Sequence, residues 1–293
     1  MSDRKVLIAK ADSAEHITDR IKRGADGIEI QLLDRKGVKK LTIEDVKENI
    51  DKFSAVTSVH SALSDSIGEV DIAFASEESN GYLYEAFEIA EFIGKHFGRH
   101  VGVVIHNTFT LNEYMNLDIL SFTINMIRTV LDRYPDTDLF IENGAPAKTH
   151  ESFAEGMAAF FEKLAGIFKF GYEKRVFFLL DTCHAMISSD FWAYANEDRN
   201  LFDTEYRKYF ELFGPYCKEI HLSDKKGAGI IKGHHGIPFE KYDFGSEARF
   251  DTTMHYIEKY MTNATICLEV PEKDYDHAEN FSKMKEMVDN WKR

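Results

Sequence analysis

The sequence predicts a single (β/α)₈ barrel domain that spans all 293 residues. Three observations point to it: eight short apolar runs recur along the chain, helical patterns lie between them, and no linker interrupts the alternation. Continuous apolar runs are typical of parallel strands buried on both faces. Because closure into a barrel leaves no strand with an unpaired edge, the pattern favours a barrel over an open doubly wound sheet, which it leaves possible.

The apolar runs give the predicted strands, and capping signals and apolar stripes give the helices between them. Ser13 can cap the first helix, Thr42 with Asp45 resembles a capping box for the second, and an apolar stripe from Leu83 to Ile93 marks the third. The predicted strands are 5–8, 27–32, 55–60, 101–106, 138–142, 176–181, 219–222 and 265–269. Further helices are predicted at 111–134, 151–170, 201–213, 248–261 and 277–291.

The longest irregular segment, residues 224–247, follows the seventh predicted strand and contains GHHGIPF. Long loops at this end of a barrel usually carry function or form a lid. Aromatic side chains are expected in or near loops, where they either wall a sugar-sized pocket or pack the loops against the barrel. They are Phe191, Trp192, Tyr194 and Phe239.

Composition bounds the classes of protein that the chain can belong to. The sequence is 44% hydrophobic and 29% charged, and its apolar runs are too short to span a bilayer. The start of the chain lacks the features of a secretory signal, so a cytoplasmic location is the default expectation. Three cysteines without CxxC spacing predict buried thiols. The net charge of −14 disfavours nucleic acid, although a local basic groove or bound metal could overcome it.

Seven potential metal ligands stand at or just after the ends of the predicted strands. A lone histidine there more often packs or caps, and a lone carboxylate is often simply solvated. Because the carboxyl ends of barrel strands meet at one face, the shared position favours a common site that binds a divalent metal. The seven are His60, His106, Glu142, Asp181, His184, His221 and Glu269.

The segment LLDTCHA is the most specific local signal. Its three-residue spacing lets the turn after the strand direct Asp181 and His184 toward the same opening at the carboxyl end of the barrel. Cys183 is expected to pack in the interior rather than to bind metal. His221 adds a nitrogen donor from the next strand, with Asp224 as its orienting partner or as a turn residue. His234 and His235 follow in the long loop, and the sequence does not decide which of them faces the site.

These residues resemble the xylose isomerase-like TIM barrels, a superfamily that includes endonuclease IV and many sugar isomerases and epimerases. The resemblance covers nearly the whole chain, and DTCHA is its closest verbatim match. It implies a metal cluster at His60, His106, Glu142, Asp181, His184, His221, His234 and Glu269. Lys232 breaks the Asp-x-His pair of the endonuclease branch, which puts a third ion in doubt.

Other departures concern the substrate. Leu63 and Ser64 stand where the endonuclease branch has an aromatic and aliphatic pair that penetrates DNA, and Glu29 in GADGIEIQL is common in the sugar isomerase branch. A basic cluster follows the second strand and is read as a solvated loop or as a phosphate contact. It consists of Arg35, Lys36, Lys39 and Lys40.

The leading hypothesis is a divalent metal-dependent isomerase or epimerase of a sugar, sugar phosphate or related polyol. Zinc or manganese is expected, as one to three ions, because several imidazoles favour a transition metal. One ion is assigned to Glu142, Asp181, His221 and Glu269, with the two glutamates also exchanging protons on opposite faces of the substrate. The expected substrate contacts are His184, His234 and Glu29.

Two alternatives remain. An endonuclease IV-like zinc phosphodiesterase acting on abasic DNA would hold one zinc with His60, His106 and Glu142, and Glu142 would bridge to a second. A noncatalytic metal-binding or regulatory barrel is the third reading and fits the paired carboxylates least, because these have the geometry expected for proton transfer. Nucleic acid is therefore a possible partner that is not favoured, and no membrane partner is expected.

Overall fold

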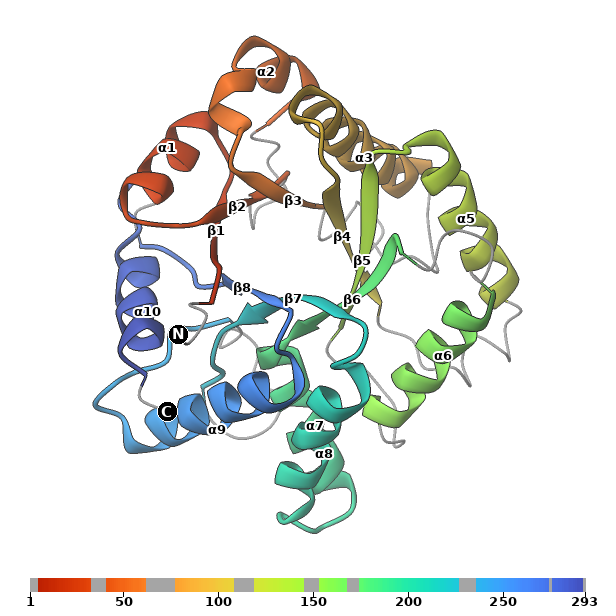
Figure 1. Cartoon of the computed structure of the whole chain (residues 1–293). Coiled ribbons are helices and arrows are strands. Elements are labelled where there is room, and N and C mark those ends of the chain that lie inside the picture. The colour runs from red at the N-terminus through yellow and green to blue at the C-terminus, as the bar shows by residue number, and fades with distance from the viewer. Residues whose placement is uncertain are drawn as a thin grey trace.

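The computed structural model describes residues 5–32, 41–61, 77–107, 119–144, 153–167, 174–226, 236–273 and 276–291. Within these ranges eight parallel strands close into one barrel in the order β1 to β8. Figure 1 looks into this ring and shows the helices arranged around its outside. The predicted (β/α)₈ barrel is therefore confirmed, and the open sheet is excluded.

The element order alternates strands and helices along the chain. The strands are β1 (Leu7–Ala11), β2 (Gly27–Gln31), β3 (Val56–His60), β4 (Val101–Asn107), β5 (Thr137–Asn143), β6 (Val176–Asp181), β7 (Cys217–Leu222) and β8 (Thr265–Leu268). The described helices are α1 (Ala14–Lys22), α2 (Ile43–Glu48), α3 (Glu77–Phe97), α5 (Ile119–Arg133), α6 (Phe153–Ile167), α7 (Thr182–Ala195), α8 (Leu201–Phe213), α9 (Phe244–Tyr260) and α10 (Glu279–Asn290), with a 3₁₀ turn at Ile50–Phe53.

The helix signals read from the sequence are present in the structure. The Ser13 hydroxyl accepts a hydrogen bond from the backbone N–H of His16 at 3.2 Å and begins α1. Thr42 and Asp45 form both halves of a capping box at the start of α2. The apolar stripe of α3, from Leu83 to Ile93, is buried against the strands.

Most strand ends lie within one residue of the predicted bounds, and two strands differ by more. The first runs from Leu7 to Ala11 rather than over 5–8, so it includes Lys10. The seventh begins at Cys217 rather than at Glu219. In both cases a charged residue interrupts the apolar run: Lys10, which is paired inside the barrel, in the first strand, and the exposed Lys218 in the seventh.

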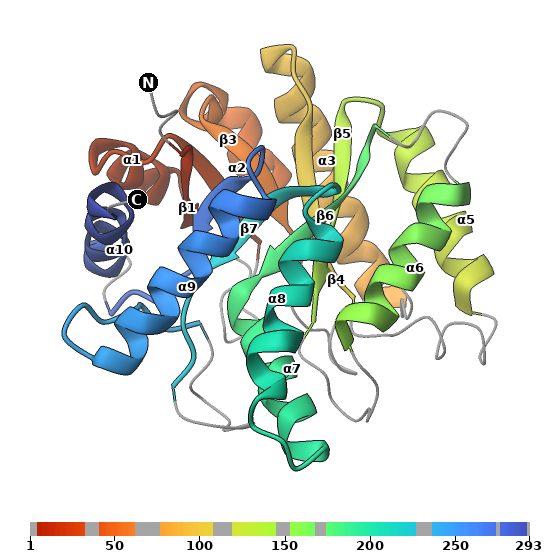
Figure 2. The same ribbon diagram turned by 60° about the horizontal axis from the view of Figure 1, so that its bottom comes forward.

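Helix α7 was not predicted, because the segment after the sixth strand was read as a loop. Phe191, Trp192 and Tyr194 therefore lie on a helix and not in loops. The helix lacks a single apolar stripe because it packs on several sides, mainly against α8 and β7, and several of its buried polar residues are hydrogen-bonded. Ser188 and Ser189, for example, donate to the carbonyls one turn earlier. Figure 2 shows α7 and α8 side by side.

Alternation along the strands decides which side chains face the barrel interior. On β4, Val103 and Ile105 belong to the core between strands and helices, while Val104 packs with Phe140 and Leu179 in a separate inner cluster. Gly102 leaves the space that the Phe140 ring fills. Because residues two apart share a face, the residues after this inner layer, His106 on β4 and Glu142 on β5, also point inward.

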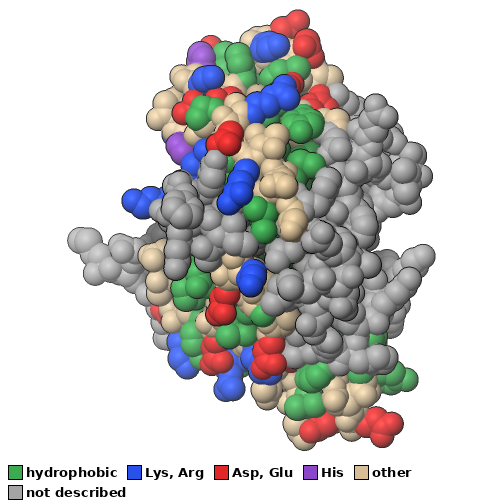
Figure 3. Space-filling model, turned by 90° about the vertical axis from the view of Figure 1, so that its right-hand side faces the viewer, with side chains coloured by type: hydrophobic (Ala, Val, Ile, Leu, Met, Phe, Trp, Pro, Cys, Tyr) green, Lys and Arg blue, Asp and Glu red, His purple; other side chains and the backbone are tan. Residues whose placement is uncertain are grey.

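The outer surface shows charges of both signs. On the side of the molecule that carries α5 and α6, acidic, basic and apolar side chains are interspersed over the described atoms (Figure 3). None of the described helices combines the length and apolar character needed to cross a membrane.

Candidate metal centre

Two sets of residues that share Glu142 lie near the carboxyl end of the barrel. In the first, a ligand atom from each of His60, His106 and Glu142 lies within 4.8 Å of the others. In the second, the same holds for Glu142, Asp181, His221 and Glu269. The structure thus brings together six of the seven strand-end residues, and His184 lies at their edge.

The first set is held by hydrogen bonds that fix its rings. His60 donates from Nδ1 to the carbonyl oxygen of Ser61 at 2.9 Å, which turns Nε2 toward Glu142 Oε2 at 3.1 Å. His106 Nε2 lies 3.2 Å from the same oxygen. Anchoring one ring nitrogen on a backbone carbonyl while the other faces a ligand site is the usual arrangement of metal-binding histidines.

In the second set, Nδ1 of His221 and Oε2 of Glu269 are buried, face each other as an ion pair at 2.8 Å and are aligned for a hydrogen bond with no other described group. Zinc binds nitrogen and carboxylate donors at about 2.0–2.2 Å, so donors around one ion lie about 3 Å apart. A shared cation would satisfy both atoms, and the donor set therefore fits a divalent metal.

The carboxyl groups of Glu29 and Glu219 are buried on the Nε2 side of the His221 ring, and Glu29 fixes the orientation of the ring. Its Nε2 donates to Glu29 Oε2 at 2.9 Å, and Glu219 lies beside Glu29 and accepts from the Ser58 hydroxyl. Burial would raise the pKa of Glu29, but His221 and Lys10 lower that pKa to about 2. Burial and the Glu29 charge raise the pKa of Glu219 well above its usual range. Glu29, expected at the substrate, thus lies fully buried beneath His221.

A lysine that sequence reasoning missed lies within the same cluster. Lys10 Nζ lies 2.5 Å from Glu269 Oε1 and 3.1 Å from Glu29 Oε1. Burial would lower the pKa of Lys10, but the two carboxylates outweigh it and raise the pKa well above its usual range. Lys10 is therefore a fixed positive charge among the acidic groups. Its position two residues after Ile8 on the inner face of β1 is the signal that could have revealed it.

The Asp181 and His184 pair is built at the start of α7 rather than in an open turn. Asp181 is the N-cap, and its Oδ1 accepts from the backbone N–H of His184 at 2.7 Å. His184 in turn donates from Nδ1 to the carbonyl oxygen of Asn143 at 2.7 Å. Asn143, also missed from the sequence, pairs with the Asp181 backbone through both atoms of its amide.

The charge states in the cluster follow from burial and neighbours. Burial would raise the pKa of Glu142, yet His106 and His221 hold it well below its usual range. Burial would also raise the pKa of Glu269, which Lys10 and His221 hold well below its usual range. Burial lowers the pKa of His184, so this ring is neutral at pH 7 and Nε2 is its acceptor.

Several residues considered from the sequence lie outside the described ranges. They are Arg35, Lys36, Lys39, Lys40, Leu63, Ser64, Lys232, His234 and His235. Asp224 is described, and it binds Arg249 and Ser246 rather than His221.

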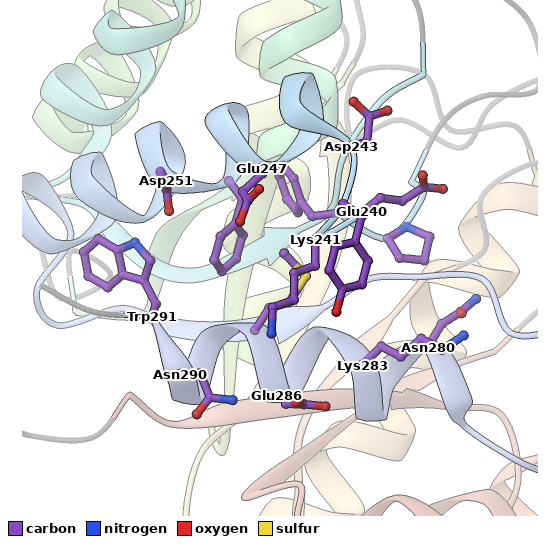
Figure 4. Close-up of a pocket in the computed structure, with 15 residues that line it drawn as sticks. Glu240, Lys241, Asp243, Glu247, Asp251, Asn280, Lys283, Glu286, Asn290 and Trp291 are labelled. Atoms are coloured by element: carbon purple, nitrogen blue, oxygen red, sulfur yellow. The ribbon is translucent and has the colours of Figure 1, made fainter.

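A separate open groove of about 1180 Å³ lies outside the barrel between α9 and α10 (Figure 4). Phe239, expected in a loop near the site, is buried in the segment before α9, where its ring packs against Phe250. The groove contains none of the candidate metal ligands, so it is distinct from the centre described above.

Comparisons with known proteins agree with the fold. Residues 21–291 match the family described as xylose isomerase-like TIM barrel. Similar solved structures include a D-tagatose 3-epimerase-like protein (16% identity, 97% of this chain and 95% of that chain covered, TM-score 0.56). A second is a D-allulose 3-epimerase from Methylomonas sp. (14% identity, 98% of this chain and 97% of that chain covered, TM-score 0.57). A third is the IOLI protein with a bound zinc atom (12% identity, 97% of this chain and 96% of that chain covered, TM-score 0.60). No curated protein matches significantly.

Proposed function

Because the chain belongs to the family of xylose isomerase-like TIM barrels, we propose that it is a divalent metal-dependent isomerase or epimerase. Its substrate class is a sugar, a sugar phosphate or a related polyol. One observation carries the proposal: Glu142 on β5 and Glu269 after β8 reach one donor set with Asp181 and His221. Two carboxylates that converge from distant strands are suited to act on two faces of one bound molecule.

The similar structures support the same reaction class. Among them are the D-tagatose 3-epimerase-like protein and a D-allulose 3-epimerase solved in complex with D-allulose. The IOLI protein carries a zinc atom. At identities of 16% or less the likeness shows the fold alone, so the reaction class is part of the proposal and the substrate is left to experiment.

Glu142, Asp181, His221 and Glu269 would hold the metal, with Glu29 fixing the His221 ring from below. When bound, a divalent cation supplies Lewis acidity that polarises a carbonyl or adjacent hydroxyl oxygen of the substrate. Zinc and manganese suit this mixture of one imidazole and three carboxylates.

The protein's own groups move the proton. One of the carboxylates of Glu142 and Glu269 removes the proton from the carbon beside the carbonyl, and the other returns a proton on the opposite face. Both groups have lowered pKa values, so each begins as a carboxylate, and the one that returns a proton first takes it up from solvent water. The neutral His184 ring accepts a hydrogen bond from a substrate hydroxyl at Nε2 and so orients the sugar.

A second candidate is favoured by the first donor set. His60, His106 and Glu142 together offer a site for a second ion, and Glu142 belongs to both sets. Two ions held by these residues with Glu142 shared between them would supply the Lewis acidity that phosphodiester hydrolysis requires. An endonuclease IV-like activity on abasic DNA is therefore the alternative to be tested beside the first.

The proposal is tested by incubating metal-loaded protein with a panel of ketohexoses, pentuloses and their phosphates in D₂O. We expect at least one pair of sugars to interconvert, with deuterium incorporated at the carbon that changes, because the carboxylate that returns the proton takes it from the solvent. Proton NMR measures the exchange as the loss of the signal from the proton on that carbon. Cleavage of an abasic duplex, together with no exchange in any sugar, would instead establish the phosphodiesterase.

A further inference from the structure

Lys10 is placed at the metal centre by strand order and not by a loop. Strand β1 lies between β8 and β2, and Lys10 is paired in register with Glu29 on β2. Its ammonium contacts Glu29 on one side and Glu269, which follows β8, on the other. The side chain is 10% exposed, so its charge is held inside the cluster.

The two oxygens of Glu269 have different partners. Oε1 accepts from Lys10 at 2.5 Å, whereas Oε2 lies 2.8 Å from His221 Nδ1, inside the candidate metal set. A carboxylate can bind a cation through one oxygen or through both. While Lys10 holds Oε1, only Oε2 is directed to the set.

We propose that Lys10 is a positioning residue that restricts Glu269 to one-oxygen metal binding, because its hydrogen bond keeps Oε1 off the metal while the second lone pair of Oε1 can still take up the substrate proton. This inference rests on the proposed metal site. The Lys10 ammonium lowers the affinity of the site for metal, because a nearby cation repels a divalent ion, and it serves turnover instead.

Removing the ammonium therefore has opposite effects on binding and turnover. In Lys10→Met, Glu269 can bind through both oxygens and the repulsion is gone, so the metal binds more tightly. The oxygen that moves the proton is then taken up by the metal, so turnover falls. A lysine that merely supported the structure would weaken metal binding when lost.

The test measures Zn²⁺ and Mn²⁺ affinity by competition with a chelator, beside kcat on whichever substrate the sugar panel identifies. For Lys10→Met we expect Kd to fall roughly tenfold or more and kcat to fall roughly tenfold or more. Lys10→Arg keeps the charge, and its metal affinity should stay within about threefold of the wild type. Lys5→Met is the matched control, since Lys5 donates to the carbonyls of Met261 and Thr262 at the opposite end of the barrel.

Unchanged or weaker metal binding in a folded Lys10→Met variant overturns the inference, and Lys10→Gln takes its place if the methionine variant does not fold. Combining Lys10→Met with Glu269→Gln should remove the gain in affinity, because the gain requires the second carboxylate oxygen. A wild type that binds neither ion contradicts the proposed function and the inference with it. A wild type that binds metal while the variant shows no gain contradicts the role of Lys10 alone.

Discussion

Replacing Glu142 with glutamine is expected to reduce turnover by at least about 10³-fold while the protein stays folded. Glutamine has nearly the same shape but can neither carry the negative charge nor accept a proton. Glu142 is the one residue common to both donor sets, and its two oxygens face His60, His106, His184 and His221. The change therefore removes a metal ligand and a proton carrier together.

The measurement is kcat with saturating metal, accompanied by circular dichroism and thermal unfolding. Glu44→Gln provides the control, because this glutamate is 71% exposed on α2 and its loss should leave activity intact. Full activity in Glu142→Gln would sink the mechanism, whatever the metal content of the variant.

Replacing Arg249 with methionine is expected to cost about 3 kcal/mol of unfolding free energy. Its guanidinium donates to both oxygens of Asp224, each at 2.7 Å, and Asp224 is 1% exposed. Asp224 also accepts from the Ser246 hydroxyl and pairs through its backbone with Ile237. Loss of the arginine leaves a buried carboxylate without its cation, which is costly because the charge has been removed from water.

Urea unfolding measures this cost, with one slope of unfolding free energy against urea concentration used for all variants. Arg207→Met is the matched control, because Arg207 and Glu211 form an exposed pair on α8 that should contribute less than about 0.5 kcal/mol. Equal midpoints for the two variants would show that the Asp224 contacts contribute little to stability.

The fold could be predicted because buried parallel strands carry a strong signal. Eight apolar runs at regular spacing gave the barrel, and caps such as Ser13 placed the helix starts. Helix α7 could not be found in this way, since it is packed on several sides and shows no stripe. The first strand was ended too early because its inner face is charged at Lys10.

The convergence of the site could be expected because strand ends meet at one face of a barrel, and the structure brings Glu142, Asp181, His221 and Glu269 together there. The partners of these residues were not predictable. Glu219 and Asn143 act through contacts between residues far apart in the sequence, which a single sequence does not reveal. Their roles depend on register, and a shift of one residue reverses which face a side chain takes.

Elemental analysis shows which of the two donor sets holds the essential ion, and we expect it to be the set that contains Asp181. Wild type, His106→Ala and Asp181→Ala proteins are purified without added metal, and ions are counted per chain. We predict about one zinc or manganese ion that is retained in His106→Ala and lost in Asp181→Ala. An ion retained in Asp181→Ala and lost in His106→Ala, or a wild type without metal, would show that the set containing Asp181 does not hold the essential ion.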